Sequence, residues 1–453
     1  MRMSKEEAKL MRHSALRRAA VPVILGALLL AAARPAAAQF EDYEIYGTAE
    51  FSTDYSVRRY GDPEQAASGL LAGVINQRHY LPQGELFGRS RIELSDSEQI
   101  SHRLEEGYLR LYPTPAVTLS LGRQRLNWGA GYTYSATDAL HPQAAESDRA
   151  IGFDGTAVTW FPTPDTSVAG ALALQDAYEL SQMDSAAGGG AEGYERLRYA
   201  GYLSNYFGNL QIDGTFVYEA ETILRPGVAG SLTVGDTLLS AEGAVELRNQ
   251  SIYPEKGFDP TDPTVARALQ RGEPIPGLEQ ADAYDPYPII TGAAERSFGD
   301  GDLTITVILE YLYNSMGYDG EEFDALLNTV TAFDEGGFAF LEESAGEQPF
   351  SGFSGELGAG APFDGAGYFG LLRRHYLFQT VGLSWSESWS SEHSVLVGAE
   401  DWSALVSHTV TLTTIEQVDL GLQVRWSVGE KEKDEFGLLP NYAVASLRGT
   451  VHF

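Results

Sequence analysis

Alternation of apolar and polar residues is the most extensive pattern in this 453-residue chain. Between Leu303 and Tyr313 every odd-numbered residue is apolar or aromatic, so one face carries an unbroken stripe. A repeat of two predicts a β-strand, because successive side chains of a strand point to opposite faces. The clearest predicted strands occupy residues 43–53, 86–95, 117–124, 151–161, 167–174, 197–207, 210–218, 239–247, 303–313, 418–428 and 441–453. Weaker alternation predicts strands around 70–81, 104–112, 229–235, 287–297, 373–385, 394–402 and 406–414.

The connections between these strands alternate between short and long. The short ones are rich in the turn formers Pro, Gly, Asn and Asp, and they occupy 82–84, 113–115, 162–165, 208–209, 235–236, 299–302, 387–392 and 416–417. The long ones occupy about 54–69, 127–150, 175–195, 249–286, 314–372 and 429–441. Such alternation is typical of an antiparallel barrel with short periplasmic turns and long extracellular loops.

We therefore predict an all-β fold, a transmembrane antiparallel up-and-down β-barrel of eighteen strands, with sixteen as the alternative. No segment after the N-terminal region offers about 18 consecutive apolar residues, so a helical span is not expected there. A soluble β-sandwich remains a competing interpretation of the same strands. A solenoid is disfavoured because no sequence repeat of fixed period is present.

The N-terminal region predicts export. Arg17 and Arg18 precede an apolar run at 19–33, and an Ala-Ala-Ala stretch at 36–38 supplies a cleavage site. These features predict a signal peptide over residues 1–38, followed by a single barrel domain over 39–453. A membrane anchor is the alternative. The sequence contains no cysteine, which excludes disulfides and cysteine-based catalysis or metal sites.

The composition is strongly acidic, with 63 Asp and Glu against 31 Lys and Arg. Removal of the predicted signal peptide increases the imbalance, because that region holds seven basic and two acidic residues. A nucleic-acid partner is not expected, since phosphate binding needs a basic surface. Most of the excess acid is expected in the long loops.

Two features carry a resemblance to a known class. The last predicted strand stops at Phe453, and Gly-Arg-Gln at 122–124 is followed by Asn-Trp-Gly-Ala-Gly at 127–131 and by Asp138. Together with the predicted signal peptide, they resemble a Gram-negative outer-membrane β-barrel protein of the porin-like type. The resemblance implies an outer-membrane location, contact with lipid and lipopolysaccharide, and assembly machinery that reads Phe453. It is also compatible with a homotrimer.

The segment with the Gly-Arg-Gln motif supplies a candidate rim element, formed by Arg123, Arg125, Trp128 and Asp138. It would meet the solute at a rim or constriction, or it would be a bulge with an interface aromatic that anchors the strand.

Residues out of phase with the apolar stripes are expected to face the lumen. These candidate pore-lining residues are Arg89, Arg91, Glu93, Glu106, Tyr108, Arg110, Arg196, Arg198, Glu242, Glu246, Arg425 and Arg448. One interpretation is a field across a constriction that orients polar solutes. The other is that these groups pair with one another and solvate the lumen.

A channel for passive or weakly selective passage of small polar or charged solutes is the function we predict from the sequence. A barrel hydrolase is less favoured, because the only Ser two residues from a His is Ser391, in a predicted turn beside His393, and no Gly-x-Ser-x-Gly elbow occurs. Adhesion through the long acidic loops is a further alternative. Residues 321–333 have helical spacing and could narrow the pore. No metal or other cofactor is expected.

Overall fold

A computed structural model describes residues 43–58, 65–95, 100–126, 128, 135–137, 153–174, 197–219, 223–247, 252–254, 264, 277–280, 286–300, 302–324, 373–386, 388–415, 417–430, 434–437 and 441–452. The predicted signal peptide, Asp138, Arg196 and Phe453 lie outside these described residues. Within the described ranges, no helix has the length and apolar character needed to cross a membrane.

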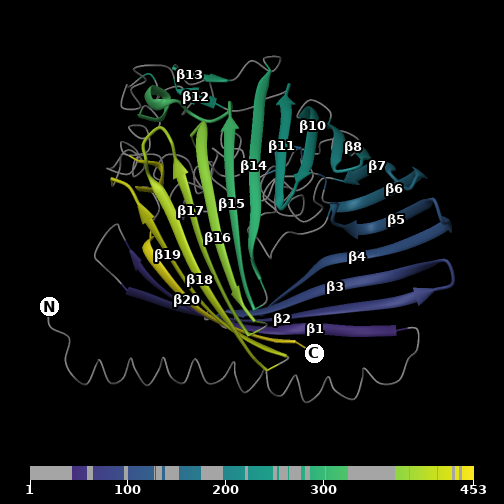
Figure 1. Cartoon of the computed structure of the whole chain (residues 1–453), viewed down its shortest axis with the longest axis horizontal. Coiled ribbons are helices and arrows are strands. Elements are labelled where there is room, and N and C mark those ends of the chain that lie inside the picture. The colour runs from purple at the N-terminus through teal and green to yellow at the C-terminus, as the bar shows by residue number, and fades with distance from the viewer. Residues whose placement is uncertain are drawn as a thin grey trace.

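Eighteen strands form one closed antiparallel sheet (Figure 1). The strands of this barrel are β1 (Tyr43–Arg58), β2 (Gln65–Leu81), β3 (Gly84–Ser95), β4 (Ile100–Thr114), β5 (Val117–Gln124), β6 (Phe153–Thr163), β7 (Thr166–Leu174), β8 (Leu197–Phe207), β9 (Leu210–Glu219), β10 (Ile223–Val234), β11 (Thr237–Glu246), β14 (Tyr287–Asp300), β15 (Leu303–Asn314), β16 (His375–Trp385), β17 (Trp389–Gly398), β18 (Ala404–Ile415), β19 (Val418–Val428) and β20 (Asn441–His452). Each strand pairs with its neighbours in this order, and β1 pairs with both β2 and β20. The predicted eighteen-stranded barrel is confirmed, and the alternative of sixteen strands is excluded.

Short turns and long connections lie at opposite edges of the barrel. β1 begins at the short-turn edge, because Tyr43 pairs with His79 close to the turn between β2 and β3. Two of the short turns place a glycine in the left-handed region, Gly208 at φ 64° and Gly235 at φ 60°, where other residues are disfavoured. Beyond the long-loop edge, β12 (Ile252–Pro254) and β13 (Leu278–Gln280) pair only with each other (Figure 1).

Several strand boundaries differ from the sequence-based ones. β1 and β2 extend into the predicted loop at 54–69, reaching Arg58 and starting at Gln65. β17 begins at Trp389, so Ser391 and His393 lie on a strand and not in the predicted turn. The prediction of a turn there was wrong because the Trp-Ser-Ser-Glu-His stretch is polar, and its apolar phase shows only farther along the strand. The predicted helix at 321–333 is described only over 320–324, which are helical.

The two faces of the sheet differ in chemistry and burial. On β3, Leu86 and Ile92 are exposed, whereas Glu85, Phe87 and Arg91 on the other face are buried. Exposed apolar side chains suit contact with lipid, and a crowded polar face suits the interior of a closed barrel. We therefore call these the outer face and the inner face. The outward stripe predicted on β15 follows this rule, since Leu303, Leu309 and Tyr311 are exposed.

Candidate functional site

A cluster of charged side chains covers the inner face of β3, β4 and the end of β5. At its centre the Glu105 side chain is 0% exposed. Glu105 Oε2 accepts a hydrogen bond of 2.7 Å from Arg89 Nε. Two further guanidinium groups approach the same carboxylate, Arg103 Nη2 at 3.5 Å and Arg125 Nη2 at 3.8 Å. One buried acid is therefore shared by three arginines.

A β-bulge explains why Glu105 escaped the sequence analysis. Arg89 pairs with Glu106, whereas the next residue, Ser90, pairs with Leu104. Glu105 is the extra residue, and beyond it the alternation of β4 changes phase. Strict alternation therefore selected Glu106 alone, and it also missed Arg103. The consecutive acids at 105 and 106 were the only signal of this bulge in the sequence.

The predicted residues next to this cluster are also engaged in ion pairs. Arg91 Nε donates to Glu93 Oε1 at 2.6 Å, and Arg91 Nη2 lies 3.4 Å from Glu50 Oε2 on β1. Arg110 Nη1 donates to Glu85 Oε1 at 2.8 Å.

Tyr108, another predicted lumen residue, is buried on the same face, and its ring centroid lies 4.6 Å from Arg110 Cζ. This distance suits a cation–π contact. Together these contacts connect β1, β3 and β4 through their inner faces.

Several buried polar atoms of this cluster lack a hydrogen-bond partner among the described residues, including the acceptor Glu105 Oε1. Buried nitrogens without a hydrogen-bond partner among the described residues include Arg91 Nη1, Arg103 Nε, Arg103 Nη2, Arg125 Nε and Arg125 Nη2. The ion pairs of Arg103 and Arg125, at 3.5–3.8 Å, are too long to count as hydrogen bonds. Buried donors in native proteins usually have partners. The ion pairs of this cluster are therefore looser than ideal, and the Arg103 and Arg125 side chains remain 31% and 23% exposed.

The rim element proposed from the sequence is divided between the two faces of the sheet. Arg123 lies on the outer face, where its Nε and Nη2 atoms contact Asp154 of β6 at 3.0 and 2.6 Å. Arg125 lies on the inner side, 3.8 Å from Glu106. Arg123 therefore does not share a site with Arg125. The physical reason is that β5 continues its alternation through Gln124, whose side chain is buried on the inner face.

Trp128 is the third member of this element, and it is buried at the inner face. Its ring stacks on Tyr202 of β8, with centroids 5.5 Å apart and planes at 14°. The cluster around Trp128 consists otherwise of small or β-branched residues, Ala157, Ala169, Ala171, Ala173, Ala200 and Val217. The sequence did contain a signal for this packing, because the three alanines of β7 share one face.

The remaining predicted pore-lining residues of the described chain lie on the inner face of their strands. Glu242 and Glu246 are buried on β11. Each of the other three lies two positions from a buried residue of the same face, in the pairs Arg198 with Ala200, Arg425 with Ser427, and Arg448 with Ser446. Glu246 is bound by the buried Arg225, whose Nη2 lies 2.6 Å from Glu246 Oε2. Sequence reasoning missed Arg225, because β10 was predicted only from residue 229.

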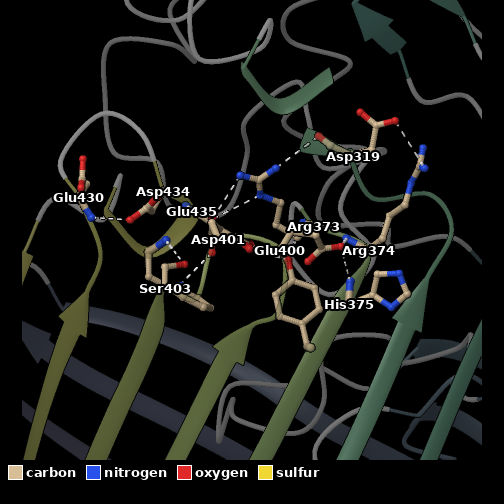
Figure 2. Close-up of polar contacts among 12 residues, drawn as sticks. Asp319, Arg373, Arg374, His375, Glu400, Asp401, Ser403, Glu430, Asp434 and Glu435 are labelled. Carbon is tan, nitrogen blue, oxygen red and sulfur yellow. Dashed lines mark hydrogen bonds and ion pairs between the residues drawn. The ribbon is translucent and has the colours of Figure 1, made fainter. Parts of the chain in front are cut away.

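A second arginine network lies at the long-loop edge, above β16–β19 (Figure 2). The Arg373 and Asp401 side chains are 4% and 7% exposed and pair at 3.3 Å. The guanidinium group of Arg373 lies 3.6 Å from the ring centroid of Phe323, which is fully buried. The hydroxyl of Tyr376 accepts from the backbone N–H of Arg373 and donates to Glu435 at 2.6 Å. We call these residues the cap network.

The cap network joins three connections. Asp401 belongs to the β17–β18 turn, and Glu435 belongs to a 3₁₀ turn (Glu435–Gly437) between β19 and β20. The described ends of the β15–β16 connection meet through Arg374, whose Nη2 donates to Glu322 at 3.0 Å. Asp319 and Glu322 exchange backbone hydrogen bonds as a capping box at the start of the helical turn.

Hydrogen bonding also sets the ionisation of Asp401. Burial acts to raise its pKa, but bonds from the Glu435 N–H and from Ser403, together with nearby Arg373, outweigh burial and lower the pKa below 3.8. Asp401 therefore carries its charge while buried beside Arg373. Among the described residues, no group of three or more His, Asp or Glu side chains is placed to hold a metal.

Comparisons with known proteins show a likeness in fold. No protein-family model matches the sequence, and no curated protein matches it either. The chain resembles the solved structure of OccAB1 from Acinetobacter baumannii, with a TM-score of 0.53 and 9% identity over 90% of this chain and 96% of that one. It also resembles OccK2 (OpdF) from Pseudomonas aeruginosa, with a TM-score of 0.52 and 9% identity over 91% and 98% of the two chains. A BenF-like porin from Pseudomonas fluorescens Pf-5 gives a TM-score of 0.51 and 9% identity over 91% and 99%.

Proposed function

We propose that this chain is an outer-membrane, porin-like channel that passes small polar or charged solutes passively or with weak selectivity. The observation that carries the proposal is a closed barrel of eighteen strands whose inner face holds charged groups with unused donors. Natural barrels of sixteen to eighteen strands are wide enough for an aqueous channel. Charged side chains on a channel wall select among solutes by their charge.

The comparisons support this proposal through the printed names of similar structures. One of them is a BenF-like porin, and OccK2 was also solved in complex with glucuronate, a small carboxylate. The signal peptide, lipopolysaccharide contact, assembly through Phe453 and a homotrimer belong to the same proposal. They rest on the sequence alone.

The charged cluster of β3–β5 supports a preference for anionic groups. A guanidinium group offers several donors in a fixed plane, which matches a carboxylate or phosphate. Arg103 and Arg125 each keep two buried nitrogens without a hydrogen-bond partner among the described residues. The side chains of Arg89, Arg103, Arg110 and Arg125 are nevertheless 23–33% exposed, so a carboxylate in the lumen can approach their guanidinium groups, and the inner face of β3–β5 is the proposed region of solute contact.

Conductance tests the proposal directly. Purified protein in a planar bilayer should show discrete steps, and the reversal potential in a salt gradient should report its ion preference. Heat-modifiable migration on gels should accompany the folded barrel. The proposal is wrong if the folded protein shows no conductance, either intact or after deletion of residues 321–345, because the barrel would then be closed and structural.

A further inference from the structure

Part of the connection between β5 and β6 lies against the inner face of strands that follow β5. We call Trp128 and residues 135–137 the inner segment. Trp128 packs on β6–β9, where its neighbours are mostly alanines. Ala136 is fully buried in an apolar cluster that includes Ile289, Leu312 and Tyr376, from β14, β15 and β16. The inner segment therefore covers wall positions on β6–β9 and β14–β16, strands that do not carry the charged cluster.

One carboxylate holds the inner segment. Glu242 Oε2 on β11 accepts hydrogen bonds from Ser135 Oγ at 2.8 Å, Thr137 Oγ1 at 2.9 Å and the Thr137 N–H at 3.1 Å. Thr137 Oγ1 also lies 3.3 Å from the carbonyl oxygen of Trp128. Three bonds to one charged oxygen form a strong anchor, because bonds to charged groups exceed neutral ones.

The wall beneath the segment is shaped to receive it. A Cβ added to Gly227 of β10 would lie 3.0 Å from Thr137 Cγ2 and 2.6 Å from Thr215 Oγ1. A larger residue would require Thr215 to move and Thr137 to shift slightly, so glycine fits the wall at this position best. Small residues under Trp128 and a glycine under Thr137 are two separate adaptations of the wall to the same segment.

We infer that Glu242 is a positioning residue that fixes the inner segment over the β6–β11 wall, so that the solute path runs along the charged wall of β1–β5. This inference rests on the proposed channel function and assigns it a path. The sequence predicted Glu242 as a pore-lining residue, either acting on solutes or pairing with other groups of the lumen. Its bonds instead assign its carboxylate to the protein's own segment.

Thiol accessibility tests this arrangement, since the chain contains no cysteine. Ser52→Cys places a thiol on the inner face of β1, and Ala171→Cys places one in the buried cluster that contains Trp128. A cationic methanethiosulfonate reagent should modify the thiol of Ser52→Cys and reduce single-channel conductance. Ala171→Cys should react about tenfold or more slowly, because only transient opening exposes it. Equal rates in the two variants would overturn the inference.

Release of the anchor should remove this protection. Glu242→Ala in the Ala171→Cys background should raise the modification rate toward that of Ser52→Cys. If Glu242→Ala fails to fold, the double variant Ser135→Ala with Thr137→Val serves instead. It removes the two hydroxyl groups that donate to Glu242 and leaves Glu242 itself in place. Glu295→Gln is the matched control, because this acid lies on the inner face of β14 and bonds to no described residue of the segment. Protection that survives loss of the anchor would contradict the role of Glu242.

The test separates this inference from the channel proposal. Modification is measured by mass on folded protein and needs no conductance. A protected Ala171→Cys without conductance would support the anchored segment and refute the channel. Conductance with an unprotected Ala171→Cys would support the channel and refute the anchored segment.

Discussion

The two arginine networks of the barrel use the same residue type in opposite ways. In the cap network, every buried polar side-chain atom of Arg373, Asp401 and Tyr376 has a partner within the described structure. In the cluster of β3–β5, Arg103 and Arg125 approach Glu105 but leave buried donors unused. One network is complete, and the other leaves several buried donors and one buried acceptor, Glu105 Oε1, without hydrogen-bond partners among the described residues.

This difference separates a structural role from a functional one. A complete buried network loses several kcal/mol when one partner is removed, because the remaining charge is stranded. An incomplete network already contains unsatisfied donors, so removal of one arginine should cost little stability. We therefore expect the cap network to hold the long-loop edge rigid. We expect the charged cluster to contact solutes.

The largest expected effect is on stability in the cap network. Asp401→Ala strands Arg373, which is almost fully buried, and should lower the free energy of unfolding by about 3–5 kcal/mol. Urea unfolding of protein refolded into lipid vesicles would measure the loss. Arg103→Gln is the comparison variant and should change the same free energy by less than about 1 kcal/mol, since two donors without hydrogen-bond partners disappear with the charge. Equal losses in the two variants would erase the distinction between the networks.

The next effect concerns selectivity in the charged cluster. Neutralisation of Arg89 and Arg91 together should shift the permeability ratio toward cations, because Glu50, Glu93 and Glu105 would lose positive partners. The reversal potential in a salt gradient measures this shift.

Neutralisation of two loop acids is the control for this selectivity test. Asp259→Asn with Asp262→Asn should shift the ratio less, and less still at high salt, because the sequence predicts both acids in a surface loop, and water-exposed charges are screened beyond about 8 Å at physiological ionic strength. A larger effect of the loop variant would place selectivity outside the barrel wall.

A smaller effect follows from the ionisation of Asp401. Its folded-state pKa is lowered, so the charge stabilises the fold at pH values above 3.8 and the stabilisation is lost as the pH falls through the folded-state pKa. The difference in unfolding free energy between the natural protein and Asp401→Asn should therefore shrink as the pH falls below about 3.8. A difference that stays constant over this range would show that hydrogen bonding alone, without charge, holds the cap network.

The smallest effect is expected for the pair on the outer face. Arg123→Gln removes a partly exposed ion pair with Asp154 and should cost less than about 1 kcal/mol. Its reversal potential should match that of the natural protein, because Arg123 lies on the face opposite to Arg125. A selectivity shift as large as that of the Arg89 and Arg91 variant would contradict the placement of Arg123 on the outer face and would show that it lines the pore.

The barrel was predictable because its physics is local and repeated. The alternation on β15 and the turn formers between strands each follow from short stretches of sequence. A single inserted residue breaks that logic, which is why Glu105 and Arg103 were missed at the bulge. The inner segment was also beyond prediction. Its anchor, Glu242, lies 105 residues from Thr137 in sequence, and no local pattern connects them.

The cap network illustrates a further limit of sequence reasoning. Arg373, Asp401 and Glu435 lie in three different connections, and no spacing between them signals a contact. Alternation predicted strands at 373–385 and 394–402, which include Arg373 and Asp401, but a strand pattern does not indicate which strand ends come together. Contacts between residues of different loops can be identified only when the three-dimensional arrangement of the strands is known.

The closure of the sheet between β1 and β20 has a consequence for biogenesis. These strands pair although roughly 400 residues of chain separate them, and the ring of Phe51 lies where a Cβ of residue 449 would stand. Until this seam forms, a partly assembled chain exposes two edges of unpaired backbone groups, which invite aggregation. Substitution of Gly449 by a larger residue should therefore lower the yield of closed barrels. The barrels that do close should keep the conductance of the natural protein. Pairing of β1 with β20 removes both open edges at once, so a barrel is either closed along this seam or left with two unpaired strands.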